Sequence, residues 1–145
     1  MNHDARRRLE DLLNREITAA QSLAQTLAAE RTALTGDSPA AVQEKAAEKI
    51  GLLGSIEEME GERRSLWSSA GADIAAYGDA VATRWRTLMA LMANCRTANE
   101  VNGHIIHIRQ NQIRQLFDIV RGGAPATYGP HGKTFAKTLR ALARA

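Results

Sequence analysis

Apolar residues recur every three or four positions along most of the chain, which is the spacing of one face of an α-helix. The first such run begins near Asp4 and ends near Thr35, where Gly36 is suited to stop a helix. Its apolar positions are Leu9, Leu13, Ile17, Ala20, Ala24, Leu27 and Leu34. We therefore predict one long amphipathic helix in this stretch.

A second helical run starts directly afterwards, with Asp37 or Ser38 as its N-cap and Pro39 in its first turn. Each glycine inside a helix costs about 1 kcal/mol relative to alanine, so we expect close approach of a neighbouring helix to offset part of that cost. The apolar positions are Val42, Ala46, Ile50, Leu53, Ile56, Met59, Leu66 and Trp67, and the glycines are Gly51, Gly54 and Gly61.

The third run is the longest, and we predict Asp79 as its N-cap. Its spacing alternates between four and three residues without interruption until Gly122 and Gly123 end it, which is typical of a coiled-coil-like seam. The seam comprises Val81, Trp85, Leu88, Met92, Cys95, Asn99, Asn102, Ile106, Arg109, Ile113, Leu116 and Val120.

The three runs predict an all-α fold, an antiparallel, coiled-coil-like bundle of three long helices. At 1.5 Å per residue the first two helices are about 45 Å long and the third about 65 Å, so the third should overhang by roughly a dozen residues. The overhang lies near Arg109 to Arg121, and it leaves Ile113, Leu116, Phe117 and Val120 without helical cover. A partner, a second copy or the chain's own C-terminal segment would then have to cover them.

Composition agrees with this architecture, because aromatic residues are only 4% of the 145 and there are three prolines. We expect a single domain over residues 1–121 and a Gly-rich, basic tail, flexible or short-helical, over residues 122–145. A single cysteine and no apolar run of about 20 residues indicate a cytoplasmic protein.

The charge is uneven, although the net charge is only +3. No acidic residue follows Asp118, whereas basic residues continue to the end of the chain: Arg121, Lys133, Lys137, Arg140 and Arg144. Nucleic acid or an acidic protein surface would attract such a tail. A basic helical nucleic-acid-binding or scaffold protein is therefore the alternative function at this stage.

No catalytic or metal-binding arrangement is recognisable, so we predict neither an enzyme nor a bound cofactor or metal. Cys95 lies on the apolar seam, where it is expected to be a small core residue. Glu100, His104 and His107 share one helix, but a di-iron bundle needs ligands from several helices. The segment from Thr127 to Lys133 has threonine where a phosphate-binding loop begins with glycine.

Two asparagines interrupt the apolar seam, at Asn99 and Asn102. One interpretation is a polar layer that fixes the register of the helices, and the other is direct contact with a partner. The residues alone leave both open.

Several segments resemble the FlgN-type flagellar type III export chaperones: Arg84-Trp85-Arg86, the run from Cys95 to Ile106, the Arg/Gln-rich stretch to Leu116, and Tyr128-Gly129-Pro130-His131-Gly132-Lys133. The resemblance is most specific between Trp85 and Lys133. His131 stands where this tail signature is expected to have aspartate, a departure that keeps the glycines of the turn.

The resemblance implies a non-enzymatic cytoplasmic chaperone that binds the hook-filament junction proteins FlgK and FlgL before their export. Such chaperones shield terminal helical segments of their clients, and an exposed apolar stripe suits that task. We predict client binding at Asn102, Ile106, Arg109, Ile113, Leu116, Phe117 and Val120. The resemblance also implies that a tail tyrosine contacts the cytoplasmic domain of the export gate protein FlhA, which corresponds to Tyr128. The alternative for Tyr128 is a ring that pins the tail to the bundle.

Overall fold

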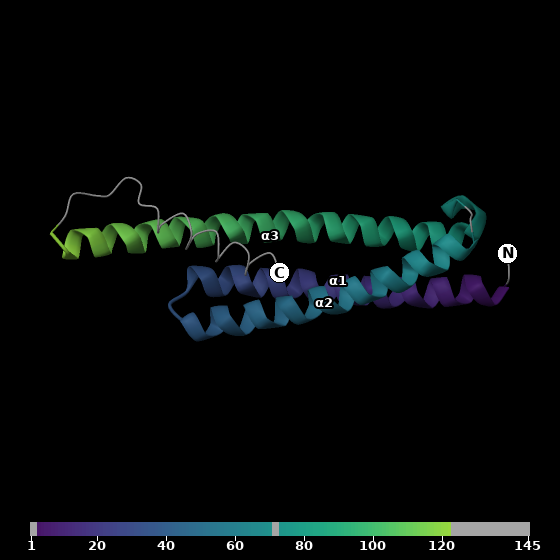
Figure 1. The fold of residues 1–145 in the computed structure, drawn as a ribbon, viewed down its shortest axis with the longest axis horizontal. Coiled ribbons are helices and arrows are strands. Elements are labelled where there is room, and N and C mark those ends of the chain that lie inside the picture. The colour runs from purple at the N-terminus through teal and green to yellow at the C-terminus, as the bar shows by residue number, and fades with distance from the viewer. Residues whose placement is uncertain (1–2, 71–72, 123–145) are drawn as a thin grey trace.

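The computed structural model describes residues 3–70 and 73–122, in which three long helices and one short 3-10 helix follow each other. The elements are α1 (His3–Thr35), α2 (Pro39–Ala70), η1 (Ile74–Tyr77) and α3 (Asp79–Val120) (Figure 1). The all-α prediction and the three long helices are confirmed for these residues.

Local chemistry explains where the helices begin and end. Ser38 caps α2, since its hydroxyl accepts a hydrogen bond from the Ala41 amide at 3.3 Å. The prediction for Asp79 was wrong, because this residue is the first of α3 and Gly78 occupies the N-cap position with a φ of +94°. Only glycine adopts that φ without strain, so the chain can turn sharply out of η1 into α3.

α1 is the central helix, because α2 and α3 each pack along it while their own backbones approach each other far less closely. The chain runs up, down and up again, so α1 is antiparallel to α2 and parallel to α3 (Figure 1). Two hydrogen bonds display the parallel register: Cys95 donates to the Ala20 carbonyl and Asn102 to the Leu27 carbonyl, one heptad further along both helices.

The core divides into two groups of buried apolar side chains, and α1 contributes to both. The first joins α1 to η1 and α3 through Leu9, Leu13, Ala20, Tyr77, Val81 and Leu88. The second lies among all three helices and contains Leu12, Leu23, Leu27, Ile56, Met59 and Cys95. Because α1 is covered on two sides, its buried surface is broader than the single stripe that the sequence predicts.

The glycines of α2 do not mark a close helix contact, so that expectation was wrong. A methyl group added at Gly51, Gly54 or Gly61 would meet nothing within 4 Å. These positions face open space, and their cost to helix stability is not offset there.

Candidate functional site

The seam of α3 contains buried residues as far as Asn102, and its exposure rises from there to the end of the helix. Leu88 is 3% exposed and Asn102 is fully buried, whereas Ile113 is 54%, Leu116 62% and Val120 83% exposed. The same apolar spacing therefore continues after the packing has ended. The predicted overhang is confirmed at this end of α3.

The packing ends because α1 and α2 end there. α1 stops at Thr35, and the guanidinium of Arg109 donates a hydrogen bond to the Gly36 carbonyl in the turn between α1 and α2, at 3.0 Å. From there to Val120 about 16 Å of α3 extends beyond the α1–α2 turn. Figure 1 shows this end of α3 projecting past the other two helices.

We call the apolar side chains along this face the overhang stripe: Ile106, Ile113, Leu116, Phe117 and Val120. Phe117 is 59% exposed, and Ile106 is half-buried where the stripe meets the bundle. Two further exposed isoleucines, Ile108 and Ile119, lie off the stripe and were not anticipated from the sequence. Four large apolar side chains exposed together on one face are unusual for a surface without a partner.

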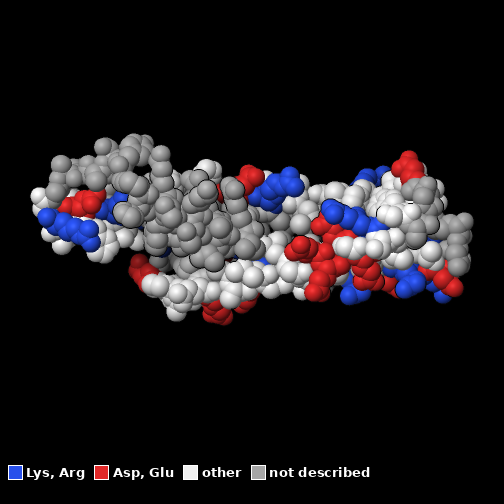
Figure 2. Space-filling view, viewed as in Figure 1, with Lys and Arg blue, Asp and Glu red and all other residues white. Residues whose placement is uncertain are grey.

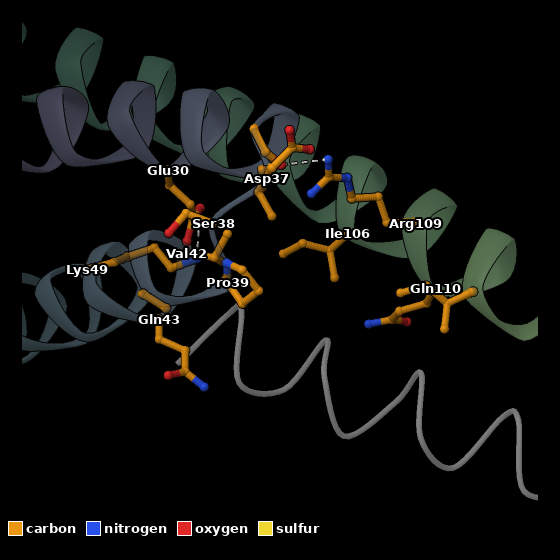
Figure 3. A pocket seen from close by; sticks show the side chains of 14 residues that line it. Glu30, Asp37, Ser38, Pro39, Val42, Gln43, Lys49, Ile106, Arg109 and Gln110 are labelled. Carbon is orange, nitrogen blue, oxygen red and sulfur yellow. Dashed lines mark hydrogen bonds and ion pairs between the residues drawn. The ribbon is translucent and has the colours of Figure 1, made fainter.

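A groove opens beside the first part of the stripe, between α3 and the α1–α2 turn, with a volume of about 640 Å³. Ile106 and Ile113 form its wall on α3, and Val42 and Ala46 of α2 lie on the other side. Leu34 from the end of α1 also lines it. In Figure 3, Ile106 reaches from α3 toward Pro39 and Val42.

Arg109, a predicted client contact, lies at the rim of this groove. Its hydrogen bond to Gly36 joins α3 to the turn at the point where the overhang starts. The guanidinium has five N–H donors, so this bond leaves donors for a second acceptor.

Asn102, also predicted as a client contact, lies inside the bundle instead. Its amide donates to the Leu27 carbonyl at 2.9 Å and to a carboxylate oxygen of Glu30 at 2.8 Å, and its oxygen accepts from Arg31 at 3.1 Å. A side chain that is fully buried and bonded on both its polar atoms offers nothing to a partner at the surface. The polar-layer interpretation describes Asn102, and we remove it from the candidate site.

The rest of this polar layer is a buried ion pair under the groove. Lys49 of α2 lies 2.9 Å from the Glu30 carboxylate, and both side chains are at most 2% exposed. Lys49 also donates to the Asn99 oxygen at 3.2 Å, so the other seam asparagine belongs to the layer as well. The layer thus ties all three helices together just below the groove.

A second buried ion pair joins α1 to α2 further along. The Nε of Arg63 donates to both carboxylate oxygens of Glu16, at 3.0 and 3.2 Å, and the guanidinium lies 4.5 Å from the centre of the Trp85 ring. Burial raises the pKa of Glu16, and the neighbouring Arg63 charge opposes that rise. Neither ion pair was predicted from the sequence.

The prediction that Cys95 is a small core residue is confirmed, because its side chain is buried. Burial also raises the pKa of its thiol, which disfavours the reactive thiolate. Within residues 3–70 and 73–122 no three His, Cys, Asp or Glu side chains are placed to hold a metal ion. In the same ranges no helix is long and apolar enough to cross a membrane.

Tyr128 and the basic residues from Lys133 onward lie outside the described residues. On the face shown in Figure 2, Lys and Arg alternate with Asp and Glu rather than forming one basic area. The described residues on this face therefore add nothing to the charge argument for nucleic acid, which rested on the tail.

Comparison with protein-family models gives a match to the FlgN protein family over residues 1–135. No curated protein and no solved structure is significantly similar to the chain.

Proposed function

This chain belongs to the FlgN protein family, and from that premise we propose which of its surfaces make the contacts of a flagellar export chaperone. Members of the family are non-enzymatic chaperones that act in the cytoplasm on the hook-filament junction proteins FlgK and FlgL, and that is the function of this chain. The family match decides between the two function classes in favour of the chaperone.

The client site that we propose is the overhang stripe, with Arg109 at its inner end. The observation that carries the proposal is the decline of burial along the seam of α3, from full burial at Asn102 to 83% exposure at Val120. Apolar residues at this spacing fit the apolar face of another amphipathic helix. A terminal helix of FlgK or FlgL laid against the stripe would supply the cover that α1 and α2 do not.

This arrangement suits a chaperone because the bundle itself does not depend on the site. The stripe contributes little buried area to the free protein, so its side chains remain available and folding does not compete with client binding. Covering the client's apolar helix before export would keep that helix from aggregating.

We further propose that Tyr128 contacts the cytoplasmic domain of FlhA. The support is the family membership together with the tail signature that surrounds the tyrosine. A tyrosine combines a large apolar ring with a hydroxyl, so it can dock in a small pocket and form one hydrogen bond; burying the ring contributes on the order of 2 kcal/mol.

Two variants test the separation of these contacts: Tyr128→Ala, and the double change Leu116→Gln with Phe117→Gln. FlgK, FlgL and the cytoplasmic domain of FlhA are each titrated against both by calorimetry. We expect Tyr128→Ala to weaken FlhA binding and reduce motility while client affinity stays near normal. We expect the double variant to weaken client binding while FlhA affinity stays near normal. Loss of client affinity in Tyr128→Ala with unchanged FlhA affinity would place the tyrosine in the client site and contradict the assignment.

A further inference from the structure

The overhang stripe is a convex ridge on a single helix, and such a ridge touches only one side of a bound helix. Helix recognition in proteins usually relies on a groove, where the apolar side chains of the ligand are surrounded and water is excluded. The groove between α3 and the α1–α2 turn is continuous with the stripe, because Ile106 and Ile113 belong to both.

We propose that the client helix enters this groove, so that the first turns of α2 form a second wall of the client site. The proposal rests on the proposed function of the overhang stripe and extends it to residues with no assigned role, Val42 and Ala46. The occupant is an amphipathic helix of FlgK or FlgL that contacts α3 from Ile106 to Val120, a length of about 21 Å, or four turns.

The chemistry of the groove matches an apolar helix with charges at its edges. Its second wall is formed by Pro39, Val42 and Ala46, and Ala46 leaves room for a large apolar side chain of the client. Lys49 and Glu30 also line the groove, but they neutralise each other in a buried ion pair and present no net charge to the occupant.

Opposite charges stand at the rim, at Asp37 and Arg109, which both line the groove (Figure 3). The guanidinium of Arg109 reaches the Gly36 carbonyl, next to Asp37 in the chain, so both charges stand together at the α1–α2 turn. They offer polar side chains of a client helix one acceptor and one donor at this end of the groove, where charges contribute to specificity more than to affinity.

The test compares Ala46→Trp with Ala47→Trp in the full-length chaperone. Both residues lie on the same turn of α2, but Ala46 is half-buried and lines the groove, whereas Ala47 is exposed and does not. We expect Ala46→Trp to weaken binding of purified FlgK or FlgL about tenfold or more and Ala47→Trp to leave it within about twofold, with helicity and melting temperature unchanged in both.

Val42→Glu, with Ala47→Glu as its control, gives a second measurement if the indole is accommodated. It places a charge on the same wall, and we expect a similar loss of client affinity. If Ala46→Trp and Val42→Glu bind clients normally while Leu116→Gln with Phe117→Gln does not, the groove inference is overturned and the stripe proposal stands. If none of these variants weakens binding, the stripe proposal fails too.

The same samples also test two other occupants of the groove, a second copy of the protein and another segment of the same chain. A fall in molar mass of the free chaperone on Ala46→Trp, measured by light scattering, would mean that a second copy fills the groove. Tighter client binding by Ala46→Trp than by the original protein would mean that another segment of the same chain competes for it. Either result overturns the inference.

Discussion

Leu116 and Phe117 provide the sharpest test of the overhang stripe, because their large side chains are exposed on the part of α3 that α1 and α2 do not cover. Glutamine is the replacement of choice, since it is a good helix former and removes the apolar surface without adding charge. The double variant should therefore keep the helix and lose the binding surface.

The size of the effect follows from exposure. Leu116 and Phe117 keep 62% and 59% of their surface in contact with water. Complete burial of such a side chain contributes about 1.5–3 kcal/mol, so covering the exposed part contributes about 1–2 kcal/mol each. Losing both predicts a client dissociation constant raised by roughly 30-fold to several hundredfold.

The expected effect on folding is small, because both side chains are already mostly exposed in the folded protein. We expect the melting temperature to shift by only a few degrees. Leu27→Ala is the comparison for a core residue, since Leu27 is 1% exposed and such a truncation costs about 2–5 kcal/mol. Calorimetric titration with FlgK and FlgL gives the affinity, and circular dichroism gives the melting temperature.

Ile108→Gln is the matched control for surface apolarity. Ile108 is 56% exposed, but it follows Ile106 by two positions and so lies about 200° around the helix axis from it. We expect this variant to bind clients normally. The reasoning is refuted if Leu116→Gln with Phe117→Gln melts as low as Leu27→Ala, or if Ile108→Gln weakens client binding as much as the double variant does.

Two further predictions concern the bundle. Gly54→Ala with Gly61→Ala should stabilise the protein by about 1–2 kcal/mol and raise its melting temperature by several degrees, because neither methyl group meets a neighbour; an unchanged melting curve would contradict this. Burial raises the folded-state pKa of Glu16, so its contribution to stability is complete below its ordinary pKa of 4.5 and is lost as the pH rises through the folded-state value. The melting temperature of the original protein relative to Glu16→Gln should therefore increase from pH 7 toward pH 5, and a constant difference would speak against the raised pKa.

The sequence was sufficient for the helices and for the overhang. Spacing of three and four residues identified α1, α2 and α3, and the rise per residue alone gave the excess length of α3. The apolar members of the predicted site, from Ile113 to Val120, lie exposed as that argument required. Length and spacing are local properties, so a single sequence contains them.

Contacts between helices could not be predicted from the sequence, because they depend on how the helices pack rather than on local spacing. Glu16, Glu30, Lys49 and Arg63 look like ordinary surface charges of amphipathic helices, and only the packing of α2 onto α1 buries them. One signal was present: Glu16 and Glu30 are fourteen residues apart, as are Lys49 and Arg63, so one antiparallel register satisfies both pairs. Pairing them from sequence requires knowing which helix faces which.

The buried polar layer and the exposed stripe are linked through that register. A seam of apolar side chains alone permits slippage by one heptad, about 10 Å, because every heptad offers an equivalent fit. Asn102 meets the Leu27 carbonyl and Glu30 only in the present register, and a slip of α3 by one heptad would separate Asn102 from Glu30 and Asn99 from Lys49. The length of α3 that projects beyond Arg109 is therefore set by buried polar bonds, and with it the number of apolar side chains offered to a client.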